Sequence, residues 1–241
     1  MTELVAKYRR DGFVKVEGLI PREEALSFRE RALEAATRLR NLSAGSSIFA
    51  QFVNVWTQDE AMKALTLDPR IAAAAKELSG SDLRIWHDQI LIKEPGTSKA
   101  TEFHQDQPYW PHANSPNPIS CWIALGDVPV ESGCMTFIPG QQNRPELPMQ
   151  NLGSSSSLFE IAPDMIWLPR VTQPLRAGDV TFHHGRCPHM ATPNLSSEAR
   201  VAHVVIFMPT TTTYTGAGHV VTDGLGLKIG EPIAGDLFPV V

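Results

Sequence analysis

The sequence predicts a mainly β fold of the α+β class, in which N-terminal helices support an antiparallel sandwich or jelly-roll core. The first third of the 241-residue chain alternates amphipathic helical segments with short strands. From Leu83 onward, strand-like segments are separated by turns rich in proline and glycine, a pattern typical of sandwiches and jelly rolls. The length suits a single domain. We expect one unit over residues 1–241, with a supporting segment at 1–80, a jelly-roll core at 83–210 and a C-terminal tail at 211–241.

Helices and strands alternate in the N-terminal third. Pro21 suits the first position of a helix, and Glu23 and Glu24 follow it in the first turn, where acidic groups interact favourably with the helix dipole. Gly80 marks the end of a later helix, because glycine readily adopts the backbone conformation that terminates helices. The expected helices span 2–10, 21–39 and 69–78, and the expected strands span 13–16 and 48–56. The second helix would bury a stripe of Ala25, Phe28, Ala32, Ala35 and Ala36.

The core strands are recognised as short runs of apolar and β-branched residues between turns. They are expected at 83–93, 101–104, 119–125, 134–138, 179–183 and 200–208. The segment 151–164 contains the serine run Ser154–Ser157 and is expected to be a long flexible insertion. Long loops of this kind are either lids over a site or plain surface loops, and the sequence leaves both open.

Composition excludes several classes of partner. Hydrophobic residues make up 42% of the chain and charged residues 20%, as in an ordinary soluble globular protein. The net charge of -5 offers no basic surface for nucleic acid. No apolar run reaches the length of a membrane span, and the charged N-terminus is unlike a secretory signal, so no membrane partner is expected. The three cysteines, Cys121, Cys134 and Cys187, lack C-x-x-C spacing and are expected to be reduced thiols of a cytoplasmic protein.

The stretch from Thr101 to Trp110 contains a candidate pair of metal ligands. His104 and Asp106 lie two residues apart, so on a β-strand both side chains would leave from the same face. A neutral imidazole and a carboxylate are ligands for a first-row divalent metal, and one more histidine would complete the facial triad of non-haem iron(II) oxygenases. Such pairs are also common on protein surfaces, so a third ligand has to come from elsewhere in the chain.

The C-terminal half supplies candidates for the third ligand and a cation. Its histidines are His183, His184, His189, His203 and His219. Arg200 opens an apolar strand, on which it shares one face with Ala202 and Val204. A guanidinium on an apolar face is costly unless an anion meets it. Either a bound carboxylate or a structural Asp or Glu of the protein would satisfy this requirement.

Together these residues resemble the phytanoyl-CoA dioxygenase family of iron(II)- and 2-oxoglutarate-dependent oxygenases. The order of the motifs is that of the family: His104-x-Asp106, then His189, then Arg200 eleven residues later. Further matching segments, also in the expected order, are 91–96, 120–125, 131–140 and 226–239, so the resemblance covers most of the chain. The chain departs from the family after Gly140, where Gln-Gln replaces the Ser-His of the family's P-G-S-H, and no histidine role carries over there.

This resemblance implies the ligands, the co-substrates and the type of core. Iron(II) would be bound by His104, Asp106 and His189, and the core would be a double-stranded β-helix of the cupin-like, jelly-roll type. 2-Oxoglutarate would chelate the iron and present its distal carboxylate to Arg200, while O2 would be the other co-substrate. The further residues expected near 2-oxoglutarate are Lys93 as a second cation, Trp122 as a wall and Gln89 as a hydrogen-bonding group.

The implied reaction is the oxidation of a C–H bond in a small-molecule substrate, with hydroxylation as the expected outcome and decarboxylation of 2-oxoglutarate to succinate. Related enzymes also desaturate, epimerise or cyclise their substrates in natural-product biosynthesis. Asp106 argues against halogenation, because halogenating relatives lack the carboxylate ligand. Aromatic walls would suit an apolar or ring-bearing substrate. The candidate wall residues are Tyr109, Trp110, Phe52, Trp56, Phe137 and the loop 154–157.

Two other readings remain open. A cupin-type metal enzyme that does not use 2-oxoglutarate would place His183 or His184 on the metal and pair Arg200 with a protein carboxylate. A non-catalytic binding module would retain the barrel around an incomplete metal site. The surroundings of the histidines and of Arg200 therefore discriminate among the three readings.

Overall fold

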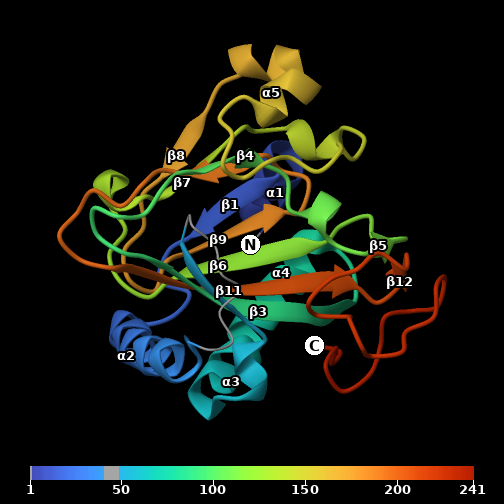
Figure 1. Ribbon diagram of the computed structural model, residues 1–241, viewed down its shortest axis with the longest axis horizontal. Helices are drawn as coiled ribbons and strands as arrows, with labels where there is room; N and C mark the ends of the chain where they lie inside the picture. Colours follow the sequence, from blue (N-terminus) through green and yellow to red (C-terminus); the bar gives the residue numbers. More distant parts are fainter. Residues whose placement is uncertain (1, 41–48) are drawn as a thin grey trace.

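Two antiparallel sheets face each other in the computed structural model, which describes residues 2–40 and 49–241 (Figure 1). Within these residues the larger sheet has six strands, in the order β1 (Phe13–Val16), β9 (Val180–His184), β6 (Ile119–Ala124), β11 (Arg200–Pro209), β3 (Leu83–Lys93) and β2 (Ala50–Val53). The smaller sheet comprises β4 (Thr101–His104), β10 (His189–Ala191), β7 (Met135–Phe137) and β8 (Val171–Gln173). A short ribbon pairs β5 (His112–Ala113) with β12 (Thr213–Tyr214). The predicted mainly β fold with a jelly-roll core is confirmed.

Helices cover the outer face of the larger sheet (Figure 1). They are α1 (Thr2–Asp11), α2 (Arg22–Arg38), α3 (Glu60–Thr66) and α4 (Pro69–Ser79), whereas α5 (Ser157–Ile161) lies by the smaller sheet. Short 3-10 helices occupy the connections: η2 (Val55–Thr57), η3 (Gln107–Tyr109), η4 (Val130–Ser132), η5 (Gln141–Asn143) and η6 (Pro163–Trp167). None of the helices in the described ranges combines the length and apolar character that a bilayer-spanning segment requires.

Strand β11 separates two apolar cores because successive side chains of a strand point to opposite faces. Val201, Val205 and Phe207 pack with the helices on the outer face. Ala202 and Val204 belong instead to the core between the two sheets. The functional residues described below lie on this inner side.

The N-terminal segment and the tail contribute more to the core than the sequence predicts. Segment 1–80 supplies both edge strands of the larger sheet, since β1 pairs with β9 and β2 pairs with β3. In the tail, Val221, Ile233 and Phe238 are buried and belong to the same core cluster as Ala202 and Val204. The Phe238 ring stacks on Trp86 with a centroid separation of 5.6 Å. The segment after residue 210 is therefore part of the folded unit.

The N-terminal elements differ from those expected in two places. Helix α3 is not predicted, although Asp59 caps it by accepting hydrogen bonds from the backbone N–H groups of Ala61 and Met62. The strand expected at 48–56 is limited to β2 and is followed by η2, and Ile48 lies outside the described residues.

The segment 151–164, expected to be a flexible insertion from its serine run, contains regular structure. Its residues form α5 and begin η6, and Leu158 of α5 is buried against Phe103 and Ile138. Glu102 of β4 donates a backbone hydrogen bond of 2.9 Å to the carbonyl of Leu152. The segment is thus attached to the strand that carries His104.

Candidate metal centre and active site

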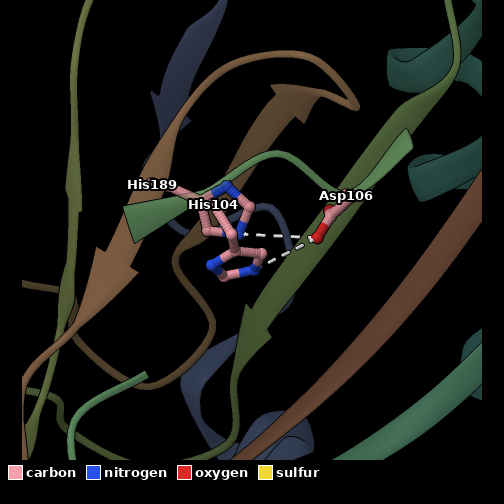
Figure 2. Close-up of side chains that lie close together, drawn as sticks. All are labelled: His104, Asp106 and His189. Carbon is pink, nitrogen blue, oxygen red and sulfur yellow. Dashed lines mark ion pairs between the residues drawn. The ribbon is translucent and has the colours of Figure 1, made fainter. Parts of the chain in front are cut away.

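His104, Asp106 and His189 lie together between the two sheets (Figure 2). His104 ends β4 and His189 begins β10, and antiparallel pairing places the two residues opposite each other. Asp106 Oδ1 lies 3.5 Å from Nε2 of His104 and 3.7 Å from Nε2 of His189. One ligand atom from each residue lies within 4.8 Å of the other two. The structure thus brings the three predicted ligands together, although the sequence does not predict β10 as a strand.

Backbone carbonyls fix the tautomers of both histidines. Nδ1 of His104 lies 2.7 Å from the carbonyl oxygen of Glu102, and Nδ1 of His189 lies 3.0 Å from that of Cys187. A carbonyl oxygen only accepts hydrogen bonds, so each Nδ1 carries the proton and each Nε2 keeps its lone pair. Burial lowers the pKa of His189 to about 3, which keeps its ring neutral. Two neutral imidazoles and one carboxylate form a donor set that fits a divalent first-row metal.

Two residues of the larger sheet hold the second oxygen of Asp106. Nε2 of His183 lies 3.2 Å and Oγ of Ser120 lies 3.3 Å from Asp106 Oδ2. Burial alone would raise the pKa of this carboxyl, but the influence of His189, His104 and His183 outweighs it and holds the pKa well below the usual range. His183 therefore contacts the carboxylate oxygen that the two ligand histidines do not face, and is in a position to orient it.

Two further candidate histidines, His184 and His203, point away from the triad. Nδ1 of His184 accepts a hydrogen bond of 2.9 Å from the backbone N–H of Arg186, so its Nε2 donates to the carbonyl of Pro116 at 3.0 Å. His203 is buried on the outer face of β11, where its Nε2 lies 2.8 Å from the hydroxyl of Thr66. These contacts are of the kind expected for structural roles.

A cavity of about 310 Å³ adjoins the triad and is lined by Arg200 and Trp122 as well. The Arg200 side chain is buried, with its guanidinium carbon 5.3 Å from the centroid of the Trp122 ring. Its Nε has no hydrogen-bond partner among the described residues. Burial lowers the pKa of Arg200 to about 10, and within the described ranges the group that opposes this shift is Cys134, not an Asp or Glu. The surroundings of Arg200 thus favour a bound carboxylate over a structural ion pair.

Lys93 pairs with Arg200 in the sheet, but its ammonium group is used differently. It donates hydrogen bonds to the carbonyl oxygens of Lys99 at 2.9 Å, Ala191 at 2.9 Å and Thr192 at 2.8 Å. These bonds use all three N–H donors of a lysine. Lys93 is fully buried and is not among the residues that line the cavity. Its placement gives no support to the expectation of a second cation for 2-oxoglutarate.

We expect Lys93→Met to destabilise the fold and to leave ligand binding largely intact. Methionine preserves most of the volume but leaves three carbonyl groups without their donor, which should lower the free energy of unfolding by about 2 kcal/mol or more. Denaturant unfolding measures this change, and titration with 2-oxoglutarate provides the comparison. A variant of native stability that had lost its affinity for 2-oxoglutarate would instead place Lys93 in the binding site.

The remaining candidates divide into two groups. Gln89, Tyr109 and Trp110 line the cavity. Trp56 and Phe137 do not: both are buried, and Phe137 packs 5.9 Å from the ring of His189 as a support. Phe52 is also absent from the lining. Sequence reasoning named His219 only as a candidate metal ligand. Among the lining residues that it did not name are Phe49, Gln51, Val53, His87, Leu152 and Val220.

The chain is similar to several known proteins. Residues 8–202 match the family model described as Phytanoyl-CoA dioxygenase (PhyH). The protein of Mus musculus named Phytanoyl-CoA dioxygenase domain-containing protein 1 is 25% identical over 166 residues, which cover 67% of this chain and 57% of the mouse protein. The match thus spans less than two thirds of the length of that relative.

Two solved structures are similar over almost the whole chain. SnoK, described as a non-haem α-ketoglutarate-dependent carbocyclase from nogalamycin biosynthesis, has a TM-score of 0.90 at 34% identity, covering 100% of this chain and 96% of its own. The epimerase SnoN, in complex with Fe3+, α-ketoglutarate and nogalamycin RO, has a TM-score of 0.86 at 35% identity, covering 99% of this chain and 97% of its own. α-Ketoglutarate is 2-oxoglutarate, so the descriptions of both neighbours name the co-substrate expected from the sequence.

Proposed function

Because this chain belongs to the phytanoyl-CoA dioxygenase family, we propose that it is an Fe(II)- and 2-oxoglutarate-dependent oxygenase that oxidises a C–H bond of a small molecule. Decarboxylation of 2-oxoglutarate to succinate accompanies this oxidation. The observation that carries the proposal is one cavity lined both by the triad and by Arg200, a cation that no described carboxylate neutralises. A metal site alone would suit many enzymes, whereas the added buried cation suits a dicarboxylate co-substrate.

His104, Asp106 and His189 would hold the metal. When bound, iron and 2-oxoglutarate supply the oxidation of a C–H bond by O2, with loss of CO2 from the co-substrate. Hydrogen bonds within the protein orient the nitrogen and oxygen atoms that would bind the metal. Backbone carbonyls hold the two imidazoles in the tautomer that binds metal through Nε2. His183 and Ser120 hold Oδ2 of the aspartate, so Oδ1 stays turned toward the two histidines.

Arg200 would bind the distal carboxylate of 2-oxoglutarate. The ring of Trp122 lies against the guanidinium and restricts its orientation. Charge attraction is stronger in this buried setting than in water, because the surrounding dielectric constant is low. Gln89 lines the same cavity and is proposed to hydrogen-bond ligands there.

The substrate is proposed to be a ring-bearing natural-product intermediate. Trp110, Val204 and Ile206 give the cavity apolar walls that suit such a molecule. The descriptions of SnoK and SnoN as a carbocyclase and an epimerase favour a second set of outcomes. Ring closure or inversion at the attacked carbon is therefore proposed as the alternative to hydroxylation. The free, buried thiols of the described chain support a cytoplasmic location.

The proposed activity is tested with protein purified anaerobically and loaded with Fe(II). We expect 2-oxoglutarate to bind the loaded protein, as measured by calorimetry, and to bind the metal-free protein much more weakly. On admission of O2, succinate should form slowly without substrate and faster with a suitable ring-bearing compound. Protein that is fully metallated yet does not bind 2-oxoglutarate would contradict the proposal and favour a cupin-type enzyme that does not use this co-substrate.

A further inference from the structure

A second group of histidines lies at the other end of the cavity from Arg200. His87 of β3 pairs with Ile206 of β11, whereas Arg200 begins that strand. Six residues of a strand span roughly 20 Å, at about 3.3 Å per residue. His87 is buried and lines the cavity. The cavity wall therefore has polar groups at both ends, and the proposed reaction uses only those at the Arg200 end.

A β-bulge directs two consecutive side chains of β3 inward. Ile206 pairs with His87, but the next residue of β11, Phe207, pairs with Ile85, so Trp86 is the extra residue. Ile85 packs with the helices, whereas Trp86 is buried between the sheets and His87 lines the cavity. Regular alternation would place these two rings on opposite faces. Bulges commonly re-aim side chains beside active sites, and this one brings an indole and an imidazole to the same wall.

The C-terminal segment supplies a second imidazole to this wall. This segment lies beside the end of the larger sheet where β11 ends and β3 begins (Figure 1). His219 lines the cavity, and its ring lies 5.9 Å from His87 and 5.2 Å from Trp86, measured between centroids. His112 packs on the same indole at 4.4 Å but does not line the cavity.

The two cavity-lining rings offer complementary hydrogen-bonding groups. Nδ1 of His87 lies 3.2 Å from the carbonyl oxygen of Asp88, so it carries the proton and leaves Nε2 as an acceptor. Nδ1 of His219 accepts a hydrogen bond of 3.2 Å from the backbone N–H of Val221, so its Nε2 is the donor. Burial lowers the pKa of His87 to about 3 and also lowers the pKa of His219, so both rings are neutral near pH 7.

We propose that His87 and His219 form a subsite for a hydroxyl group of the substrate. The hydroxyl donates its hydrogen to Nε2 of His87 and accepts one from Nε2–H of His219. A carbonyl group would engage only the donor and an ammonium group only the acceptor, while an anion would meet the lone pair of His87. The nearby Val53, Ile206 and Val220 also line the cavity, so the hydroxyl belongs to an apolar body: a ring-bearing alcohol or phenol.

This subsite gives the substrate a fixed direction in the cavity. It rests on the proposed function in so far as the bound molecule is the one oxidised. With the co-substrate at Arg200 and the hydroxyl at the opposite end, the C–H bond to be oxidised lies between them, toward the triad. His87 and His219 are positioning residues, because they contact a group of the substrate that does not react.

The test uses two probes that differ in one hydrogen-bonding group, 1-naphthol and 1-methoxynaphthalene. Their affinities are measured by calorimetry on anaerobic protein loaded with Fe(II) and 2-oxoglutarate. Native protein should bind the naphthol roughly tenfold more tightly, the effect of one or two neutral hydrogen bonds. His87→Phe and His219→Phe should each remove this preference and leave the affinity for 2-oxoglutarate unchanged. The matched control, His112→Phe, alters a ring on the same indole outside the cavity and should keep the preference.

Equal or absent binding of the two probes by native protein would overturn the subsite, as would a preference that survived in both phenylalanine variants. The 2-oxoglutarate titration in the same samples reports separately on the oxygenase proposal. A second measurement needs neither probe nor variant. Nitrogen-15 spectra of zinc-loaded native protein should show His87 as the Nδ1–H tautomer and His219 as the Nε2–H tautomer, and the reverse assignment would also overturn the proposal.

Discussion

Fe(II) binding and 2-oxoglutarate decarboxylation should be lost when His189 is replaced by alanine. This residue supplies one of three donor atoms, and its partner across the strand pair, His104, cannot supply a second one because its Nδ1 is bonded to a carbonyl. Changing a residue that only orients a ligand typically costs 10- to 100-fold in metal affinity, so loss of a ligand should cost more than about 100-fold. Anaerobic titration with Fe(II), or with Co(II) as a spectroscopic substitute, measures the change.

His183→Ala is the matched control for His189→Ala. Both substitutions remove a buried imidazole near Asp106, but His183 contacts the second carboxylate oxygen and is placed as a support. We expect it to lower metal affinity by roughly 10-fold, within the range for orienting residues. The visible spectrum of bound Co(II) should keep its form in this variant. If His189→Ala kept its metal and His183→Ala lost it, His183 would be the metal ligand and His189 the supporting residue.

Arg200→Ala should weaken 2-oxoglutarate binding by roughly 100- to 1000-fold. Truncating one partner of a buried charge pair costs about 2–5 kcal/mol, and about 1.4 kcal/mol corresponds to a factor of ten. Metal affinity should change little, because the guanidinium is not among the ligand atoms of the triad. Arg200→Lys keeps the charge but loses the planar fork, so an intermediate loss is expected.

A co-substrate analogue without the distal carboxylate separates this effect from general damage to the fold. 2-Oxopentanoate keeps the oxo acid end of 2-oxoglutarate and lacks the distal carboxylate. Native protein should bind it weakly, and Arg200→Ala should bind it with nearly the same affinity as native protein does. If the substitution weakened the binding of both compounds equally, Arg200 would act through the fold and not by contacting the distal carboxylate.

The long elements could be predicted from sequence because their patterns are strong. β3 is a long run of 11 residues whose alternation is interrupted only at the bulge, and α4 has an aspartate cap, a proline in its first turn and a terminal glycine. β10 is only three residues long and lies between Pro188 and Pro193. It is a strand because β4 pairs with it on one side and β7 on the other. Short elements of this kind depend on long-range pairing, which local propensity does not contain.

In the candidate site, too, some features follow from local sequence patterns and others depend on long-range pairing. Residue order alone suggested the metal ligands, and their convergence depends on the pairing of β10 with β4. Alternation places Gln89 and Lys93 on one face of β3, but the end of the strand turns the lysine toward three carbonyls. The same alternation could have identified His87, which shares that face. The sequence names His219 only as one of several histidines and does not place it, because it lies in an irregular segment that reaches the cavity only in the folded chain.

The triad lies where the two sheets meet. Its histidines come from β4 and β10 of the smaller sheet, while Ser120 and His183, which hold Asp106, come from β6 and β9 of the larger one. A metal ion bound there would join the two layers as well as take part in the reaction. Any ligand that binds only the folded state stabilises it, by about 2.7 kcal/mol at a hundred times its dissociation constant. The concentration of available iron would then set the free energy of unfolding of the two-sheet core, and with it the lifetime of the folded protein.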